Sequence, residues 1–257
     1  MSVCAKRIAA DTTRYGFVVA LPAEARAVAG GRWQRQDGWP VKRRCLAGGD
    51  EEIWVQCGIG PRRAAAAARW LVSQRLDCLA VFGVSGGLSP DLVPGDLILA
   101  SSVIDDCEAE NPLRLDLAGE PFRQPLVAAG LQIRRGPILT MSRPILQPAQ
   151  KAALFEQHGV LAVDMESAAV ARVANEAALP CMVLRSVCDP AQRPVPADAF
   201  DLVDERGYLS FAALLAALAK RPSLLADLLR MQRDFSPALK ALKQAGVVVR
   251  RFKAVRS

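Results

Sequence analysis

Residues 163–189 read VDMESAAVARVANEAALPCMVLRSVCD, and this stretch decides the fold class. Alanine and apolar residues recur at helical spacing over 165–178, with Asp164 in the position of an N-cap and Pro180 just beyond the end of the helix. The almost wholly apolar run 181–187 follows without a linker and predicts a buried strand. A helix that leads directly into a buried strand is typical of α/β domains.

The same alternation extends over most of the chain. Strands are predicted over 16–21, 41–46, 53–57, 78–84, 96–104 and 136–141, and helices over 22–28, 62–74, 124–129, 148–157 and 208–219. We therefore predict one catalytic domain over residues 1–219, a three-layer α/β/α arrangement around a central mixed β-sheet. Residues 220–257 predict a short C-terminal helical tail, a basic appendage whose two amphipathic helices separate at Ser236-Pro237.

Charge is distributed unevenly along the 257 residues. The net charge is +7, and residues 220–257 hold ten Lys and Arg against two Asp, so residues 1–219 carry −1. A neutral body argues against nucleic acid as a partner, whereas the basic tail would suit an anionic lipid surface or simply form a solvated helix face.

The apolar runs are too short for a membrane span or a signal peptide. We expect a cytoplasmic protein, peripheral to the inner membrane if the tail binds lipid.

Several classes of site are excluded by residue counts and spacings. The chain has one histidine, His158, and its seven cysteines include no CxxC pair, which argues against a zinc site or a Ser-His-Asp triad. Gly58-Ile59-Gly60 lacks the third glycine of a dinucleotide fingerprint, and no GK[ST] phosphate loop is present. We predict no metal and no organic cofactor.

Candidate site residues follow the predicted strands. Glu24 comes just after the first strand, Arg185 and Asp189 lie near the outgoing end of 181–187, and Glu166 is expected in the first turn of the helix before it. Open α/β sheets bind ligands at these strand ends. Each residue also has a purely structural explanation: an acidic first turn suits the helix dipole, and Asp before Pro forms turns.

Taken together, five segments resemble the nucleoside phosphorylase and nucleosidase superfamily over residues 15–219, on the side of the methylthioadenosine/S-adenosylhomocysteine nucleosidases. They are ALPAEA (20–25), CGIGPRRAAAA (57–67), FGVSGGLSPDLVPGDLILA (82–100), AVDMESAAVARVA (162–174) and LPCMVLRSVCDPA (179–191). The resemblance implies cleavage of the N-glycosidic bond of a 5′-substituted purine nucleoside with release of adenine. It also implies a small-molecule substrate and a homo-oligomer.

The same resemblance assigns roles to individual residues. Met165 and Glu166 would hold the ribosyl ring, and Asp189 would protonate or hydrogen-bond the purine at N7, where negative charge arrives. Glu24 would orient a water molecule beneath the sugar, with Arg185 nearby. The glycine-rich turn Gly83–Leu88, including Val84, Ser85 and Gly86, would bring backbone amides close to the substrate.

Water and orthophosphate both remain open as the nucleophile. A carboxylate at Glu24 repels a phosphate dianion and so favours water. Phosphorolytic relatives often carry a GDP-x-R loop, which is missing here, and a serine where this chain has Val84. Ser85, one residue later, would compensate for that change, and orthophosphate would then be a co-substrate. Its partners would come from Arg26, Arg43, Arg62 and Arg185.

Within the superfamily, the chain most resembles the hopanoid-associated phosphorylase subgroup, in FGVSGGL, VDMES, RSVCDPA and the basic helical tail. That resemblance implies adenosylhopane, a nucleoside with a polycyclic lipid at its 5′ carbon, as the substrate. The tail would then contact lipid through Leu224, Leu225, Leu228, Leu229 and Phe235. The alternatives are a methylthioadenosine/S-adenosylhomocysteine nucleosidase, and a non-catalytic nucleoside- or lipid-binding protein on the same fold.

Overall fold

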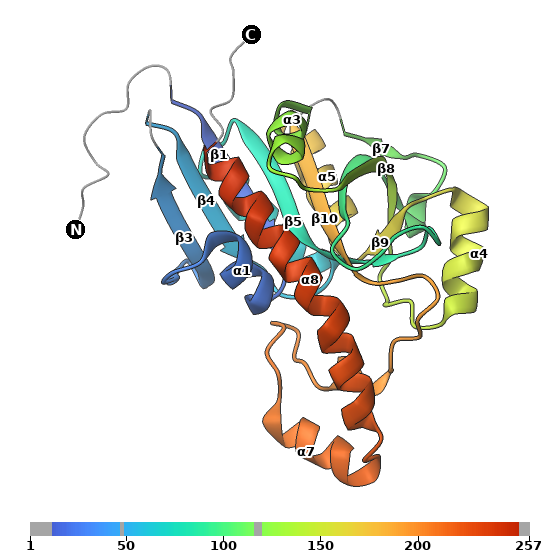
Figure 1. Ribbon diagram of the computed structural model, residues 1–257. Coiled ribbons are helices and arrows are strands. Elements are labelled where there is room, and N and C mark those ends of the chain that lie inside the picture. The colour runs from blue at the N-terminus through green and yellow to red at the C-terminus, as the bar shows by residue number, and fades with distance from the viewer. Residues whose placement is uncertain (1–11, 47–48, 116–119, 252–257) are drawn as a thin grey trace.

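The computed structural model describes residues 12–46, 49–115 and 120–251, which form one large sheet covered by helices (Figure 1). The strands are β1 (Arg14–Val19), β2 (Gln34–Gln36), β3 (Trp39–Cys45), β4 (Glu51–Gln56), β5 (Cys78–Gly87), β6 (Leu97–Asp105), β7 (Leu113–Arg114), β8 (Ile133–Thr140), β9 (Ala162–Asp164) and β10 (Cys181–Asp189). The helices are α1 (Pro22–Ala29), α2 (Pro61–Val72), the 3₁₀ turn η1 (Asp106–Glu108), α3 (Glu120–Ala128), α4 (Pro148–His158), α5 (Ser167–Glu176), α6 (Asp198–Asp201), α7 (Phe211–Lys220) and α8 (Leu224–Arg251).

The sheet is mixed, and its topology brings the candidate site residues to one edge. Strands β4, β1, β5 and β10 pair in parallel, whereas β10 pairs with β6, and β9 with β5, in antiparallel fashion. The order β10-β6-β8-β9-β5 returns to β10 through the β10–β5 pairing, so these five strands form a closed circuit. Because β1, β5 and β10 are parallel, the residues that follow them meet at the same edge.

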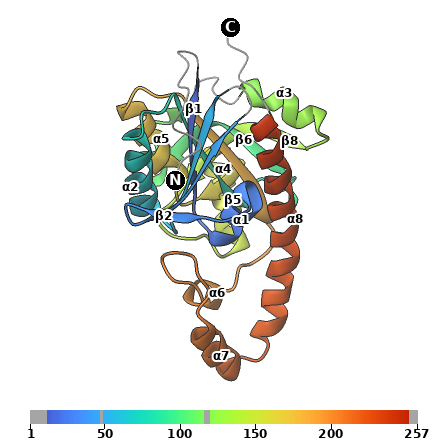
Figure 2. The same cartoon turned by 90° about the vertical axis from the view of Figure 1, so that its left-hand side faces the viewer.

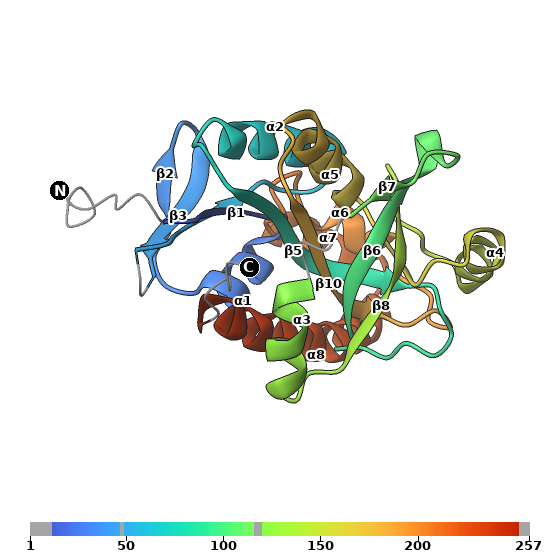
Figure 3. The same cartoon turned by 90° about the horizontal axis from the view of Figure 1, so that it is seen from above.

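Helices cover both faces of the sheet, which confirms the predicted α/β/α architecture (Figure 3). Side chains along β5 alternate between the two faces of the sheet. Leu79 and Val81 pack in the core that also contains residues of α2 and α5. Ala80 and Phe82 pack in the core that contains residues of α1 and α8. The strand is therefore buried on both sides, as its continuous apolar run predicts.

The C-terminal tail differs from its prediction. α8 is one helix of 28 residues with Pro237 inside it, not two helices separated there. Its second half is part of the core, since Ala238, Leu242 and Ala245 have no exposed surface. Burial of this face outweighs the hydrogen bond that a proline removes from a helix. The division of the chain at residue 219 into a catalytic domain and an appendage stays a prediction.

The first half of α8 and the whole of α7 project from the body (Figure 2). α7 is almost entirely apolar, reading FAALLAALAK, yet none of residues 212–220 is buried. Short α6 lies in the segment between β10 and α7. Among the described residues, no helix combines the length and the hydropathy needed to span a bilayer.

Candidate active site

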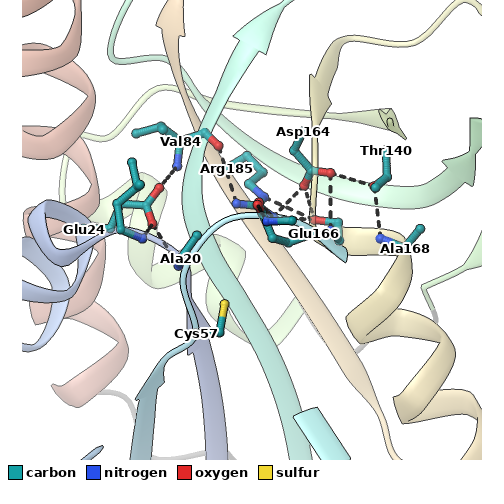
Figure 4. Close-up of polar contacts among 12 residues, drawn as sticks. Ala20, Glu24, Cys57, Val84, Thr140, Asp164, Glu166, Ala168 and Arg185 are labelled. Carbon is teal, nitrogen blue, oxygen red and sulfur yellow. Dashed lines mark hydrogen bonds and ion pairs between the residues drawn. The ribbon is translucent and has the colours of Figure 1, made fainter. Parts of the chain in front are cut away.

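The centre of the site is Arg185, on β10, whose side chain is buried to 1% exposure. Its Nη2 lies 2.6 Å from Asp164 Oδ2 and 3.5 Å from Glu166 Oε2, and it donates a 3.0 Å hydrogen bond to Ser167 Oγ (Figure 4). Burial alone would lower the pKa of Arg185, but the carboxylates of Asp164 and Glu166 raise it. The guanidinium is thus already engaged by the protein's own carboxylates.

Glu166 is not in the first turn of the helix, which corrects the prediction for this residue. α5 begins at Ser167, and Glu166 is its N-cap, with a backbone (φ −130°, ψ −29°) outside the helical region. Its Oε1 accepts a 2.9 Å hydrogen bond from the Gly60 N–H, at the turn before α2. Burial raises the pKa of Glu166 to about 7; Arg185 opposes this shift, and the neighbouring charge of Asp164 adds to it.

Asp164 has a larger role than the helix cap that the sequence predicts. Its Oδ1 does accept a bond from the Ser167 N–H at 3.3 Å, as a cap would. The same atom accepts a 2.6 Å hydrogen bond from Thr140 Oγ1, and Thr140 Oγ1 accepts one from the Ala168 N–H at 3.0 Å. Asp164 therefore joins β8, β9 and α5 to Arg185, and the sequence pattern gives no signal for the part played by Thr140.

Glu24 lies in the first turn of α1 and is buried to 1% exposure. Its Oε2 accepts hydrogen bonds from the N–H groups of Ala20 (3.0 Å) and Leu21 (2.8 Å), and its Oε1 accepts one from the Val84 N–H at 2.8 Å. Burial raises the pKa of Glu24, while the three amides and Arg185 oppose the shift. One bond at Oε1 leaves that oxygen with further acceptor capacity for a ligand or a water molecule.

The glycine-rich segment is strand rather than tight turn, because β5 continues to Gly87. Gly83 is required for close approach: a Cβ there would lie 2.4 Å from Arg185 Nη1 and 2.9 Å from Glu24 Oε1. Val84 connects the same two residues through its backbone, since its carbonyl accepts a 3.4 Å bond from Arg185. Ser85 is 3% exposed, and its hydroxyl finds no partner within the described part of the chain.

Asp189 ends β10 beside Gly86, where a Cβ would lie 3.1 Å from its Oδ2. Because Gly86 is two residues beyond Val84 on β5, this carboxylate lies roughly 7 Å along the strand from the backbone that holds Glu24. Its Oδ2 is 2.5 Å from Lys151 Nζ, and its Oδ1 accepts a 3.0 Å bond from the Cys188 thiol. Burial raises the pKa of Asp189, and Lys151 opposes the shift.

Lys151 is the main site residue that the sequence reasoning missed. It is one lysine in a helix, between Gln150 and Ala152, and no local pattern distinguishes it from a solvated surface lysine. Met165, predicted at the start of the helix, lies two residues before α5 and is half-buried.

The four arginines predicted as phosphate partners differ in position and in exposure. Arg43 bonds to Glu51, at the start of β4, so it lies at the opposite end of that strand from Gln56 and Cys57. Arg26 and Arg62 are exposed on α1 and α2, and Arg185 is engaged as described above. The described residues contain no group of three or more His, Cys, Asp or Glu side chains placed to hold a metal ion.

The arrangement suits one kind of ligand chemistry. Three carboxylates, those of Glu24, Asp164 and Glu166, surround the single guanidinium of Arg185, so the cluster carries surplus negative charge when all three are ionised. Such a site accepts hydrogen bonds from hydroxyl groups, stabilises positive charge and repels a phosphate dianion. Asp189 and Lys151 form a separate acid–base pair along the same strand edge.

Comparisons with known proteins show the family and agree with the fold. The model of the phosphorylase superfamily matches residues 14–220. A 5′-methylthioadenosine/S-adenosylhomocysteine nucleosidase of Shewanella pealeana is 27% identical over 66% of this chain and 82% of its own. A futalosine hydrolase of Streptomyces coelicolor is 32% identical over 53% and 66%. The nucleosidase structure from Neisseria meningitidis, bound to methylthio-immucillin-A, superposes with a TM-score of 0.71 at 17% identity, covering 93% of this chain and all of that one.

Proposed function

Because the chain belongs to the phosphorylase superfamily, we propose that it cleaves the N-glycosidic bond of a purine nucleoside and releases the base. The observation that carries this proposal is the placement of Glu24, Glu166 and Arg185 in one buried cluster, with Asp189 further along the same strand edge. Acceptors for a sugar and an acid for a base are thereby available on one side of the sheet.

On this proposal the cluster acts on the sugar. As the bond to the base lengthens, positive charge develops at the anomeric carbon, and the carboxylate of Glu166 stabilises that charge while it accepts hydrogen bonds from the ribosyl hydroxyls. Met165 packs against the ring. Because Glu166 is fixed by the Gly60 N–H and by Arg185, little reorganisation is needed during the reaction.

Asp189 acts on the base. The departing purine takes the electron pair of the broken bond, and a proton from Asp189 to N7 neutralises the charge that arrives there. The raised pKa of Asp189, caused by its burial, favours the protonated form that this step requires. Gly86 allows the carboxylate to lie directly against the strand.

We propose water as the nucleophile, oriented by the free acceptor capacity of Glu24 Oε1. The negative cluster and the engagement of Arg185 by Asp164 and Glu166 both disfavour an incoming phosphate dianion. Phosphorolysis is the second candidate, and the observation that favours it is the buried hydroxyl of Ser85, for which the described residues offer no hydrogen-bond partner.

For the 5′ substituent we propose a lipid, as in adenosylhopane, with a small thioether nucleoside as the alternative. The support is the exposed hairpin formed by α7 and the first half of α8, in which Leu215, Leu225 and Leu229 are each more than half exposed. Leu224, predicted on the same lipid-facing stripe, is instead buried with no exposed surface.

Lys220, Arg221 and Arg230 lie exposed near these leucines. Arg221 and Arg230 pair with Asp198 and Asp227, which leaves one surplus positive charge that would suit anionic headgroups at a membrane surface. A second copy of the chain in a homo-oligomer is the other partner that would cover this surface.

The experiment is a comparison of adenine release from methylthioadenosine, S-adenosylhomocysteine and adenosylhopane, the last presented in vesicles, with the Asp189→Asn variant as the blank. Faster release from adenosylhopane supports the lipid substrate. Release from the thioether nucleosides alone would replace it with the alternative. No release from any purine nucleoside would leave a binding protein and end the enzymatic proposal.

A further inference from the structure

Lys151 is the one residue of α4 that is buried, and its side chain has no exposed surface at all. Its ammonium donates to three acceptors: Asp189 Oδ2 at 2.5 Å, the Pro190 carbonyl at 3.0 Å and the Arg193 carbonyl at 3.3 Å. A buried ammonium is costly unless it is paired and hydrogen-bonded. All three of its N–H donors are used here, so the charged form is accommodated.

The two members of this pair face different surroundings. Lys151 is 0% exposed, whereas the Asp189 side chain keeps 21% of its exposure. A ligand can therefore reach Asp189 but not Lys151. The lysine lies on the buried side of the carboxylate, on a helix that is far from β10 in sequence. It donates to Oδ2 of Asp189, while the Cys188 thiol donates to Oδ1.

We propose that Lys151 is a positioning residue for Asp189: its ammonium holds the carboxylate from behind and supplies the positive charge against which Asp189 exchanges a proton with the departing base. This rests on the proposed cleavage of a nucleoside. The proton moves from Asp189 to the base, the electron pair of the C–N bond stays on the base, and Asp189, then a carboxylate beside Lys151, regains its proton from water during turnover.

The geometry gives this proposal a specific consequence. Without the ammonium, a largely enclosed carboxylate would lose its counter-charge and would retain its proton to higher pH. Asp189 would be a weaker acid, so kcat would fall, and the alkaline limb of the kcat profile would move upward. A lysine that merely anchored α4 to residues 190–193 would affect stability and leave that limb in place.

The test is a double-mutant cycle between Lys151→Met and Asp189→Asn, with kcat measured from pH 5 to pH 10 and folding followed by thermal unfolding. We expect Lys151→Met to lower kcat by roughly tenfold, to change KM little and to move the alkaline limb up by about one pH unit or more. In the Asp189→Asn background the same substitution should change kcat less than about twofold. Lys243→Met, which removes an exposed lysine from α8, is the matched control and should leave the profile unchanged.

Three results would overturn the proposal: an unchanged alkaline limb in Lys151→Met, an equal loss of kcat in both backgrounds, or a wild-type protein that releases no base. The last result alone also removes the proposed function, so the two failures are distinguishable. If Lys151→Met does not fold, Lys151→Gln, whose amide still donates hydrogen bonds without a charge, takes its place in the same cycle with the same expected shift.

Discussion

The two acidic regions of the site differ in their charge balance. In the carboxylate cluster, Glu24, Asp164 and Glu166 share the single cation Arg185, whereas Asp189 has Lys151 to itself. The cluster is therefore poised to stabilise positive charge, as at an anomeric carbon, and the balanced pair is poised to exchange a proton. The carboxylate cluster and the Asp189–Lys151 pair thus lie about 7 Å apart along one strand edge, the length of two strand residues, and differ in their electrostatic environment.

The largest loss of kcat is expected when the pair of Asp189 and Lys151 is removed. Asp189→Asn should lower kcat by about a thousandfold, because the acid is removed while its shape remains. Thermal unfolding should still show a cooperative transition, although Lys151 then faces a neutral amide. Near-full activity in this variant would mean that the proton comes from another group.

A smaller effect is expected from the nucleophile side of the cluster. Glu24→Gln should lower kcat by about a hundredfold, since the amide keeps the size of the side chain but loses the charge that orients water. Glu176→Gln, an exposed change on α5, is the matched control. A variant that retains wild-type kcat would place the activation of water elsewhere.

The charge of Glu166 in the carboxylate cluster should be visible in the pH dependence of kcat/KM. With its pKa raised to about 7, mainly by burial, Glu166 loses its charge as the pH falls through neutrality, and kcat/KM should fall by up to tenfold per pH unit below that point. Since the folded state raises this pKa, the contribution of Glu166 to folding stability is greatest below the ordinary glutamate pKa and is lost as the pH rises through about 7.

Profiles of kcat/KM for the wild type and Glu166→Gln check this prediction. The acid limb near pH 7 should be present in the first and absent in the second. A limb that survives the substitution belongs to another group.

The smallest effect is expected away from both regions. Leu225→Ser combined with Leu229→Ser on the exposed hairpin should change turnover of methylthioadenosine by less than about twofold, because both side chains are solvent-exposed. Turnover of a lipid-substituted nucleoside in vesicles should fall by about fivefold or more, as apolar contact area is lost. Gln232→Ser, also exposed on α8, is the control. Equal rates on the vesicle substrate would remove the lipid role of the hairpin.

The sequence predicted the alternating elements well where burial determines the pattern. The strand predicted over 181–187 is found as Cys181–Asp189, because a two-sided sheet requires an uninterrupted apolar run. Prediction from the sequence was wrong where tertiary contacts outweigh local conformational preference. Pro237 lies inside α8 because the helix buries Ala238 and Leu242 against the body, and β5 continues through its glycines because β10 and β9 pair with them.

At the site, the sequence motifs made Glu24, Glu166, Arg185 and Asp189 candidates, and the structure places Glu24, Glu166 and Arg185 in one cluster with Asp189 further along the same strand edge. The sequence did not indicate Lys151 and Thr140, because both act through contacts with residues distant in sequence. Lys151 contacts Asp189, 38 positions away, and Thr140 contacts Asp164, 24 positions away. A single polar residue in a helix or at a strand end carries no periodic signal of such a contact.

On the proposed function, the carboxylate cluster directs water, not phosphate, to the sugar. The most direct measurement is the product formed from methylthioadenosine in ¹⁸O-labelled water, with and without orthophosphate. We expect adenine release at the same rate in both, with the label in the free 5-methylthioribose. Release that requires phosphate and yields an unlabelled sugar 1-phosphate would contradict it and would leave Glu24 without the role proposed here.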